Sequence, residues 1–105
     1  MAYSKAPKFD TLTYEQSLWS KALAHPARII ILKHLLEYGI TPYHVLAKII
    51  PLAPSTVSQH LRTLRQTGLI DTSEIYPHTY YFLNHKMCKG LAAKIKSIHK
   101  SFANA

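Results

Sequence analysis

The side chains best suited to chemistry in this sequence lie between residues 55 and 66, on one face of a predicted helix over 54–67. At about 100° per residue, its hydroxyl, amide and guanidinium groups fall opposite Val57, Leu61 and Leu64. Such groups hydrogen-bond to phosphates and base edges, and glutamine and arginine pair bidentately with adenine and guanine. We therefore predict contacts to nucleic acid, with an ordinary polar helix face as the alternative. The face, which has no carboxylate, comprises Ser55, Thr56, Gln59, Arg62, Thr63 and Gln66.

The overall charge points to the same kind of partner. The chain has 105 residues, enough for one domain, with 13 lysines and arginines against five acidic residues and a formal net charge of +8. Hydrophobic residues make up 48% of it, which is typical of a folded chain. A small, strongly basic domain favours a polyanionic partner, of which nucleic acid is the commonest.

Several other classes of protein are disfavoured. One cysteine, Cys88, allows neither an intrachain disulfide nor a cysteine-built zinc site, and it is consistent with a reducing cytoplasm. The three glycines form no phosphate-binding loop, and the five acidic residues form no paired-carboxylate motif, so we do not expect an enzyme. No apolar run reaches the length of a membrane span, and the first residues lack the apolar region of a signal peptide. We expect no cofactor.

The elements that position the polar face begin after an N-terminal arm, residues 1–12. Thr13 and Gln16 have the spacing of a capping box, which predicts a helix over about 14–24. His25-Pro26 then starts a helix that is apolar almost all round and is expected at the centre of the core, ending at Gly39 in a left-handed cap. Thr41-Pro42 predicts a capped short helix over about 42–50, with Val45, Leu46 and Ile49 facing inward.

The segments after Gly68 change in character. Residues 69–74 and 79–83 are short β-branched or aromatic runs on either side of Tyr76-Pro77-His78, which predicts a hairpin. A final helix over about 85–103 follows. Two short helices, a four-residue turn and a hairpin predict a winged helix-turn-helix. The predicted fold is mainly α with a β-hairpin wing, an α+β fold in the order ααααββα, in a DNA-binding and dimerisation domain over 13–105.

Two segments resemble the ArsR family of bacterial winged-helix repressors. They are residues 21–32, KALAHPARIIIL, and residues 55–70, STVSQHLRTLRQTGLI, and Tyr80-Tyr81-Phe82-Leu83 is similar to the family's second wing strand. The resemblance covers about residues 13–102. It implies a homodimer whose first and last helices form the interface and whose two recognition helices enter successive major grooves of a palindromic operator. It also implies a repressor that a metal ion or another inducer can release from DNA.

The last helix supports a dimer independently of the resemblance. One apolar stripe along it has the 3, 4, 3, 4 spacing of a heptad-like seam, with Lys86, Lys89, Lys96 and Lys100 on the far side. The alternative is that the stripe packs on the core of its own chain. The predicted interface comprises Cys88, Leu91, Ile95, Ile98 and Phe102, with Leu18, Trp19 and Leu23 of the first helix.

The sequence departs from the family in four places. The metal-binding positions of family members are here residues such as Asn84 and Lys86, so we predict no metal site, and Cys88 is interpreted as a small buried residue. Pro51 replaces the usual glycine of the turn. Ala53 removes a capping hydroxyl unless Ser55 replaces it through a shifted helix start. The wing has no lysine or arginine, although His78 can reach a phosphate and would gain charge below about pH 6.5.

Two functional hypotheses follow. The first is a homodimeric, sequence-specific DNA-binding transcriptional regulator, a repressor whose inducer, if it has one, is unidentified. The second is a winged-helix protein-interaction module that has lost DNA binding. Arg28 has two interpretations, a contact to the DNA backbone or a structural anchor at the start of its helix. The full set of predicted DNA contacts is Ser55, Thr56, Gln59, His60, Arg62, Thr63, Arg28, Lys48, Arg65 and His78.

Overall fold

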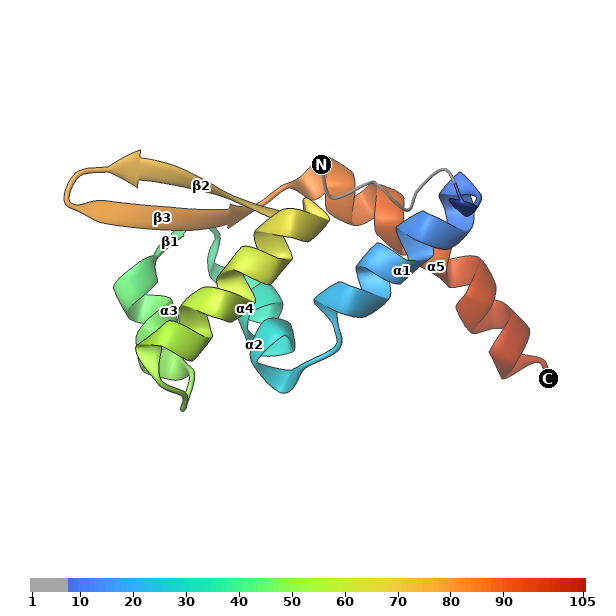
Figure 1. Ribbon diagram of the computed structural model, residues 1–105, viewed down its shortest axis with the longest axis horizontal. Helices are drawn as coiled ribbons and strands as arrows, with labels where there is room; N and C mark the ends of the chain where they lie inside the picture. Colours follow the sequence, from blue (N-terminus) through green and yellow to red (C-terminus); the bar gives the residue numbers. More distant parts are fainter. Residues whose placement is uncertain (1–7) are drawn as a thin grey trace.

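A computed structural model describes residues 8–105 (Figure 1). The fold is the predicted one, mainly α with a hairpin wing, with one short additional strand. In chain order, the elements are α1 (Thr11–Ala22), α2 (Pro26–Tyr38), β1 (Thr41–Pro42), α3 (Tyr43–Ile49), α4 (Pro54–Thr67), β2 (Ile70–Ile75), β3 (His78–Leu83) and α5 (His85–Ala103). Helices α2, α3 and α4 pack against a small antiparallel sheet, and α1 and α5 lie together beyond the base of its hairpin.

The sheet has the strand order β1-β3-β2. Strands β2 and β3 form the predicted hairpin over its full length, from the pair Ile70 and Leu83 to the pair Ile75 and His78 at the tip. Strand β1 was not predicted, because two residues are too few to show a period-2 pattern. Thr41 pairs with Tyr81 in this strand, and its hydroxyl donates to the Gly39 carbonyl. The predicted Thr41 cap is therefore wrong, and α3 begins after Pro42 without a side-chain cap.

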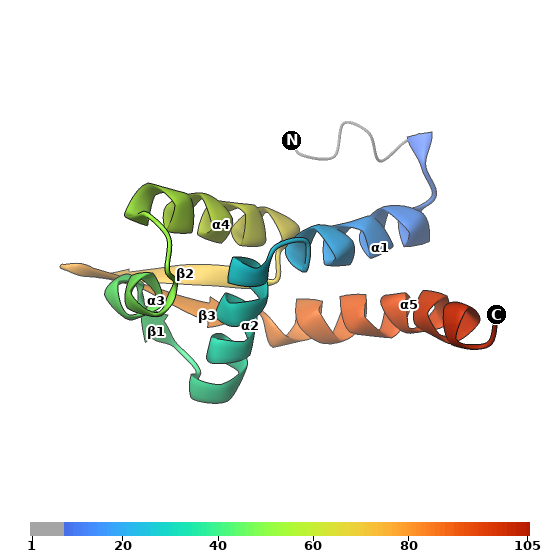
Figure 2. The same ribbon diagram turned by 90° about the horizontal axis from the view of Figure 1, so that it is seen from below.

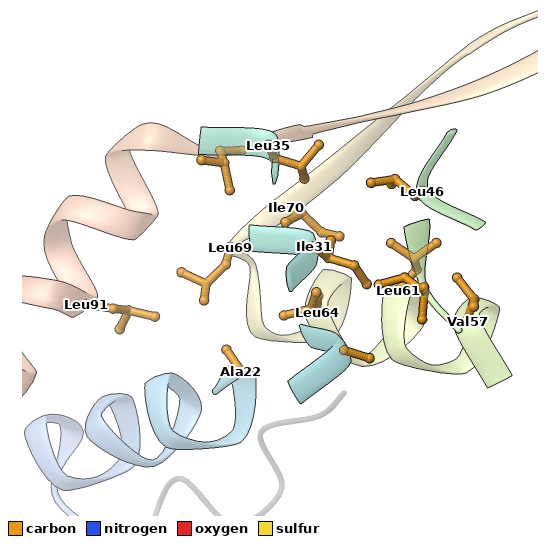
Figure 3. Close-up of a cluster of buried hydrophobic side chains, with 13 residues drawn as sticks. Ala22, Ile31, Leu35, Leu46, Val57, Leu61, Leu64, Leu69, Ile70 and Leu91 are labelled. Atoms are coloured by element: carbon orange, nitrogen blue, oxygen red, sulfur yellow. The ribbon is translucent and has the colours of Figure 1, made fainter. Parts of the chain in front are cut away.

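The core lies between α2, α4 and the base of the hairpin (Figure 3). Ile31 and Leu35 of α2 pack among residues of α4 and the strands, which close the centre of the domain. The expectation that α2 is central is correct for only one of its sides, because Ile30 and Leu36 are exposed. The buried apolar side chains of α4 and the hairpin base are Val57, Leu61, Leu64, Leu69, Ile70 and Leu83.

Helices α1 and α5 form a layer that extends away from the helix-turn-helix (Figure 2). Gln16 joins them, since its amide donates to the Lys94 carbonyl at 3.0 Å while its side chain is buried. The predicted capping box is therefore wrong. Asp10 caps α1 instead, accepting from the Thr13 amide at 2.8 Å. The helix accordingly includes the last two residues of the predicted arm, whose residues 1–7 lie outside the described part of the chain.

The glycines that end α2 and α4 adopt different backbone conformations. Gly39 has a φ of 78° but a ψ of −151°, so it takes the positive φ that glycine tolerates without the left-handed cap that we predicted. Gly68 does form a left-handed cap, at φ 82° and ψ −1°. In α3 only Leu46 is buried; Val45 is half-buried and Ile49 is exposed, so the inward face is narrower than expected.

Candidate nucleic-acid interface

The predicted polar face of α4 is open to solvent. Ser55, Gln59 and Arg62 are exposed, and Thr56 and Thr63 are half-buried, while the apolar residues of the helix point into the core. No acidic side chain lies on α4, so nothing on the helix opposes the approach of an anion. This arrangement leaves hydroxyl, amide and guanidinium groups available along one side of a rigid, well-packed helix.

The start of α4 is held by α3 and not by a cap of its own. Ala53 occupies the N-cap position with no side-chain hydrogen bond, and the helix starts at Pro54, so Ser55 does not replace the missing cap. The Tyr43 hydroxyl donates to the Pro54 carbonyl at 3.2 Å and accepts from the Ser58 hydroxyl at 3.3 Å. Tyr43 therefore fixes the first turn of α4 from α3. This role was not predicted, because a tyrosine in a short helix carries no signal beyond a polar group on an aromatic ring.

His60 and Arg28 are not on the outward face, which corrects two predicted DNA contacts. His60 is 9% exposed and stacks on His25 with a ring separation of 4.2 Å. Arg28 donates from Nε to His60 Nδ1 at 3.1 Å and from Nη1 to the Lys21 carbonyl at 2.6 Å. The guanidinium thus ties α1, α2 and α4 together. The interpretation of Arg28 as a structural anchor is the one that these contacts support.

This cluster also affects the protonation of His60. Burial, followed by the nearby His25 and Arg28, lowers the pKa of the His60 imidazole from its ordinary value. Nδ1 of His60 accepts from Arg28, and Nδ1 of His25 accepts from the Ala27 amide. Nδ1 of each ring thus accepts a hydrogen bond within the structure. Their role is to set the position of α4 on α2.

The wing and the end of α3 carry the remaining predicted contacts. Lys48 and His78 are exposed, and the ring of His78 lies 5.2 Å from that of His44 on α3. His44 was not predicted as a site residue, because a single histidine in a short helix gives no sequence signal. Polar side chains are therefore present on both sides of α4, with Lys48 and His44 on α3 and His78 on the wing.

A cavity of about 570 Å³ lies between the C-terminal half of α4 and the hairpin. Arg65, the last predicted backbone contact, lines it, and its guanidinium lies 3.8 Å from the Asp71 carboxylate in an exposed ion pair. Such pairs contribute little and break readily, so Arg65 remains available to a phosphate. Tyr81 forms the opposite wall, and burial raises the pKa of its hydroxyl. The other lining residues include Ser58, Arg62 and Gln66.

The charge of this region is small. Residues 41–83, which include α3, α4 and the hairpin, carry three basic residues against two acidic ones, a net charge of +1. The basic residues are Lys48, Arg62 and Arg65. Most of the net charge of +8 of the whole chain therefore lies outside this region. With so little net charge, binding of a nucleic acid here would depend more on the positions of individual hydrogen-bonding groups than on long-range electrostatic attraction.

The predicted dimer residues divide into two groups. Leu91 is 1% exposed in the core of its own chain, so it is not available to a partner, as the alternative interpretation allowed. The others are at least partly exposed on α1 and α5: Leu23, Ile98 and Phe102 are exposed, and Leu18, Trp19, Cys88 and Ile95 are half-buried. Three of them, Trp19, Leu23 and Cys88, line an apolar cavity of about 210 Å³ together with Ile29, Leu32, Lys33, Leu36 and Leu83.

No other chemistry is evident in residues 8–105. They contain no group of three or more histidine, cysteine or acidic side chains placed to hold a metal ion. The Cys88 thiol lies 3.6 Å from the Leu69 carbonyl, and burial raises its pKa, so the reactive thiolate is disfavoured. In the same part of the chain, no helix is both long and apolar enough to cross a bilayer.

Comparison with known proteins identifies the class to which this fold and this face belong. The model of the family "Bacterial regulatory protein, arsR family" matches residues 25–72. The "HTH-type transcriptional regulator YgaV" of Escherichia coli (strain K12) is 32% identical over 79 residues, which are 75% of this chain and 80% of the relative. The chain therefore belongs to the arsR family and is a winged-helix transcriptional regulator, as its resemblance implied, and not an enzyme.

Solved structures agree with this assignment. HlyU from Vibrio cholerae N16961 has a TM-score of 0.68 and 25% identity, with 84% of this chain and 96% of that chain covered. The transcriptional repressor BigR from Xylella fastidiosa has a TM-score of 0.64 and 27% identity, with 80% and 86% covered. Each of these two likenesses covers at least 80% of this chain.

Proposed function

We propose that the protein is a homodimeric, sequence-specific DNA-binding repressor that acts in the cytoplasm and recognises a palindromic operator. The observation that carries this proposal is the exposed, carboxylate-free face of α4 on a helix fixed at both ends. Gln59 and Arg62 provide the amide and guanidinium that distinguish bases, and Ser55 and Thr56 lie at the end of the helix that enters the major groove in such folds. Lys48, Arg65 and His78 are proposed contacts to the backbone.

The apolar surface over α1, α2 and α5 supports the homodimer. Leu23, Leu36 and Phe102 are between 37% and 78% exposed around a cavity or along the adjoining seam. Exposed apolar side chains gathered in this way are typical of an interface in a folded protein. A twofold interface would cover the same surface on both copies and would present two α4 helices to two half-sites.

The repressor role is supported by BigR, a transcriptional repressor with the same fold. A cofactor forms no part of the proposal, and the chemistry of any inducer is unassigned.

Selection of duplexes from a random library, followed by binding measurements by fluorescence anisotropy, tests the recognition by α4. We expect Gln59→Ala and Arg62→Ala each to weaken binding to the selected duplex by about 1–3 kcal/mol and to relax its sequence preference. Arg65→Ala is the matched control, because loss of a phosphate contact weakens binding to all sequences and lowers the salt slope by about 1.

The alternative, an interaction module without DNA binding, predicts a different result. In that case no duplex would be enriched by the selection, and truncation of Gln59 and Arg62 would leave binding unchanged. Circular dichroism of each variant confirms that the fold is retained, which is expected because both side chains are exposed.

A further inference from the structure

The charge of the molecule is concentrated away from α4. Helix α5 carries five of the 13 basic residues and no acidic residue, whereas residues 41–83 have a net charge of only +1. Lys94 is neutralised by Glu15 at 2.9 Å. The other four lysines of α5 are exposed and form no ion pair within residues 8–105. They are Lys86, Lys89, Lys96 and Lys100.

Three of these lysines share one side of the helix, which we call the α5 lysine face: Lys89, Lys96 and Lys100. The opposite side contacts α1, through the ion pair of Lys94 and the bond from Gln16 to the Lys94 carbonyl. At about 100° per residue, Lys89 and Lys96 lie about 140° and 160° around the helix from Lys94. In Figure 2, α1 and α4 lie above α5, so the lysine face turns to the side of the molecule away from α4.

The dimensions of the face suit a nucleic-acid backbone. At about 1.5 Å per residue, its three lysines extend over about 16 Å along the helix. A strand of duplex DNA presents a phosphate about every 3.4 Å of axis, so this length spans several phosphates. Lysines on flexible stems contact such a chain of charges without requiring a fixed register.

The composition of the face disfavours a protein partner. Interfaces between proteins are depleted in lysine and depend on aromatic or arginine anchors, and the neighbours of the lysines here are Ala92, Ala93, His85 and His99. A membrane surface is also disfavoured, because the apolar side of the first half of α5 packs inside the protein, where Leu91 is 1% exposed.

We infer that the α5 lysine face is a second, sequence-independent surface for duplex DNA, on the side of the molecule opposite α4. The inference goes beyond recognition of an operator, since this surface contacts phosphates only and requires neither α4 nor a dimer. One molecule that uses both surfaces bridges two duplex segments.

The test compares binding to a random-sequence duplex between about 50 and 200 mM salt. The variant Lys89→Gln/Lys96→Gln/Lys100→Gln is expected to bind about tenfold more weakly at the low-salt end, with a salt slope smaller by about 2–3. The control Lys8→Gln/Lys21→Gln/Lys86→Gln removes the same charge from exposed positions outside this face and is expected to bind nearly as wild type. Replacement of the three face lysines by arginine keeps the charge and is expected to keep the affinity.

Bridging is measured directly by capture of a labelled random duplex on an immobilised one. We expect capture with the wild-type protein and the arginine variant, and its loss with the glutamine variant of the face. Equal binding and capture by that variant and wild type would overturn the inference, as would an equal loss in the charge-matched control. Binding of the face to phosphatidylserine vesicles, with no change on duplex DNA, would also overturn it.

Failure of this inference is distinguishable from failure of the proposed function. The random duplex contains no operator, so the result for the lysine face does not depend on whether a preferred sequence exists. Conversely, Gln59→Ala/Arg62→Ala removes sequence preference and leaves the lysine face unchanged.

Discussion

His60 shows how a single residue can be misassigned from sequence. It lies between Gln59 and Arg62 in a polar segment, so its type suggested an outward contact. The structure instead buries it beside His25 and Arg28, because His60 lies about 100° around the helix from Gln59 and about 160° from Arg62, which share the outward face. Arg28 lies 32 residues before His60, and no sequence pattern indicates that the two side chains meet.

The buried imidazole makes stability depend on pH. Because the pKa of His60 is lowered in the folded protein, the unfolded chain binds a proton at higher pH than the folded one does. The free energy of unfolding is therefore expected to fall as the pH drops below about 6.5. Denaturant titrations at several pH values measure this dependence. In His60→Asn, which keeps an acceptor for Arg28 and does not titrate, the loss on acidification should be smaller.

His34→Asn is the control for that comparison, because this half-exposed histidine has no buried bond of its own. If wild type and His60→Asn lost stability equally on acidification, another group would be responsible.

At the scale of the element, the sequence predicted the existence and order of the helices and the hairpin, because proline and glycine mark their ends. The prediction failed where a residue fits a local capping pattern but is used in a long-range contact. Thr41-Pro42 has the pattern of a capped helix start, yet the backbone there pairs with β3, which only the tertiary fold brings near. Gln16 has the spacing of a capping box, yet its amide satisfies a carbonyl 78 residues away. Long-range pairing overrides such local patterns.

The exposed residues of the candidate site were predictable from the sequence, but the contacts that support them were not. The outward positions of Ser55, Gln59 and Arg62 followed from helical period alone, because α4 has a clear apolar side. The supporting contacts of Tyr43 and Arg28 did not, since each depends on how α1, α2 and α3 meet α4.

The missing cap of α4 leads to a prediction for the whole helix. Ala53 has the extended backbone of a capping residue, with φ −60° and ψ 146°, and lacks only the side-chain acceptor. Ala53→Ser is expected to raise the free energy of unfolding by about 1 kcal/mol, by accepting a hydrogen bond from the first turn. Ala53→Val, which adds volume without an acceptor, is the control. Equal stability of Ala53→Ser and wild type would contradict the prediction.

At the scale of the molecule, the apolar surface over α1, α2 and α5 determines the expected state of assembly. We expect light scattering to give about twice the chain mass of 11.9 kDa for the wild-type protein. In a twofold dimer, Leu23→Asp or Ile98→Asp would bury one charge from each copy in the interface. Each variant is therefore expected to be a monomer. Both residues are more than a third exposed within the chain, so the fold should tolerate the change.

Ile75→Asp serves as the comparison, since Ile75 is 59% exposed at the wing, away from that surface. A wild-type protein of single-chain mass, or aspartate variants that stay dimeric, would show that the surface has another occupant.

The cavity in this surface gives the protein a reporter of its own. Trp19, the chain's one tryptophan, forms part of the wall. Whatever covers the cavity removes water from the exposed part of this half-buried indole, which shifts its fluorescence emission to shorter wavelength. Occupation of α4 by DNA leaves the indole where it is. Unlabelled protein therefore signals the covering of one surface by the colour of its emission, independently of the binding of DNA at the other.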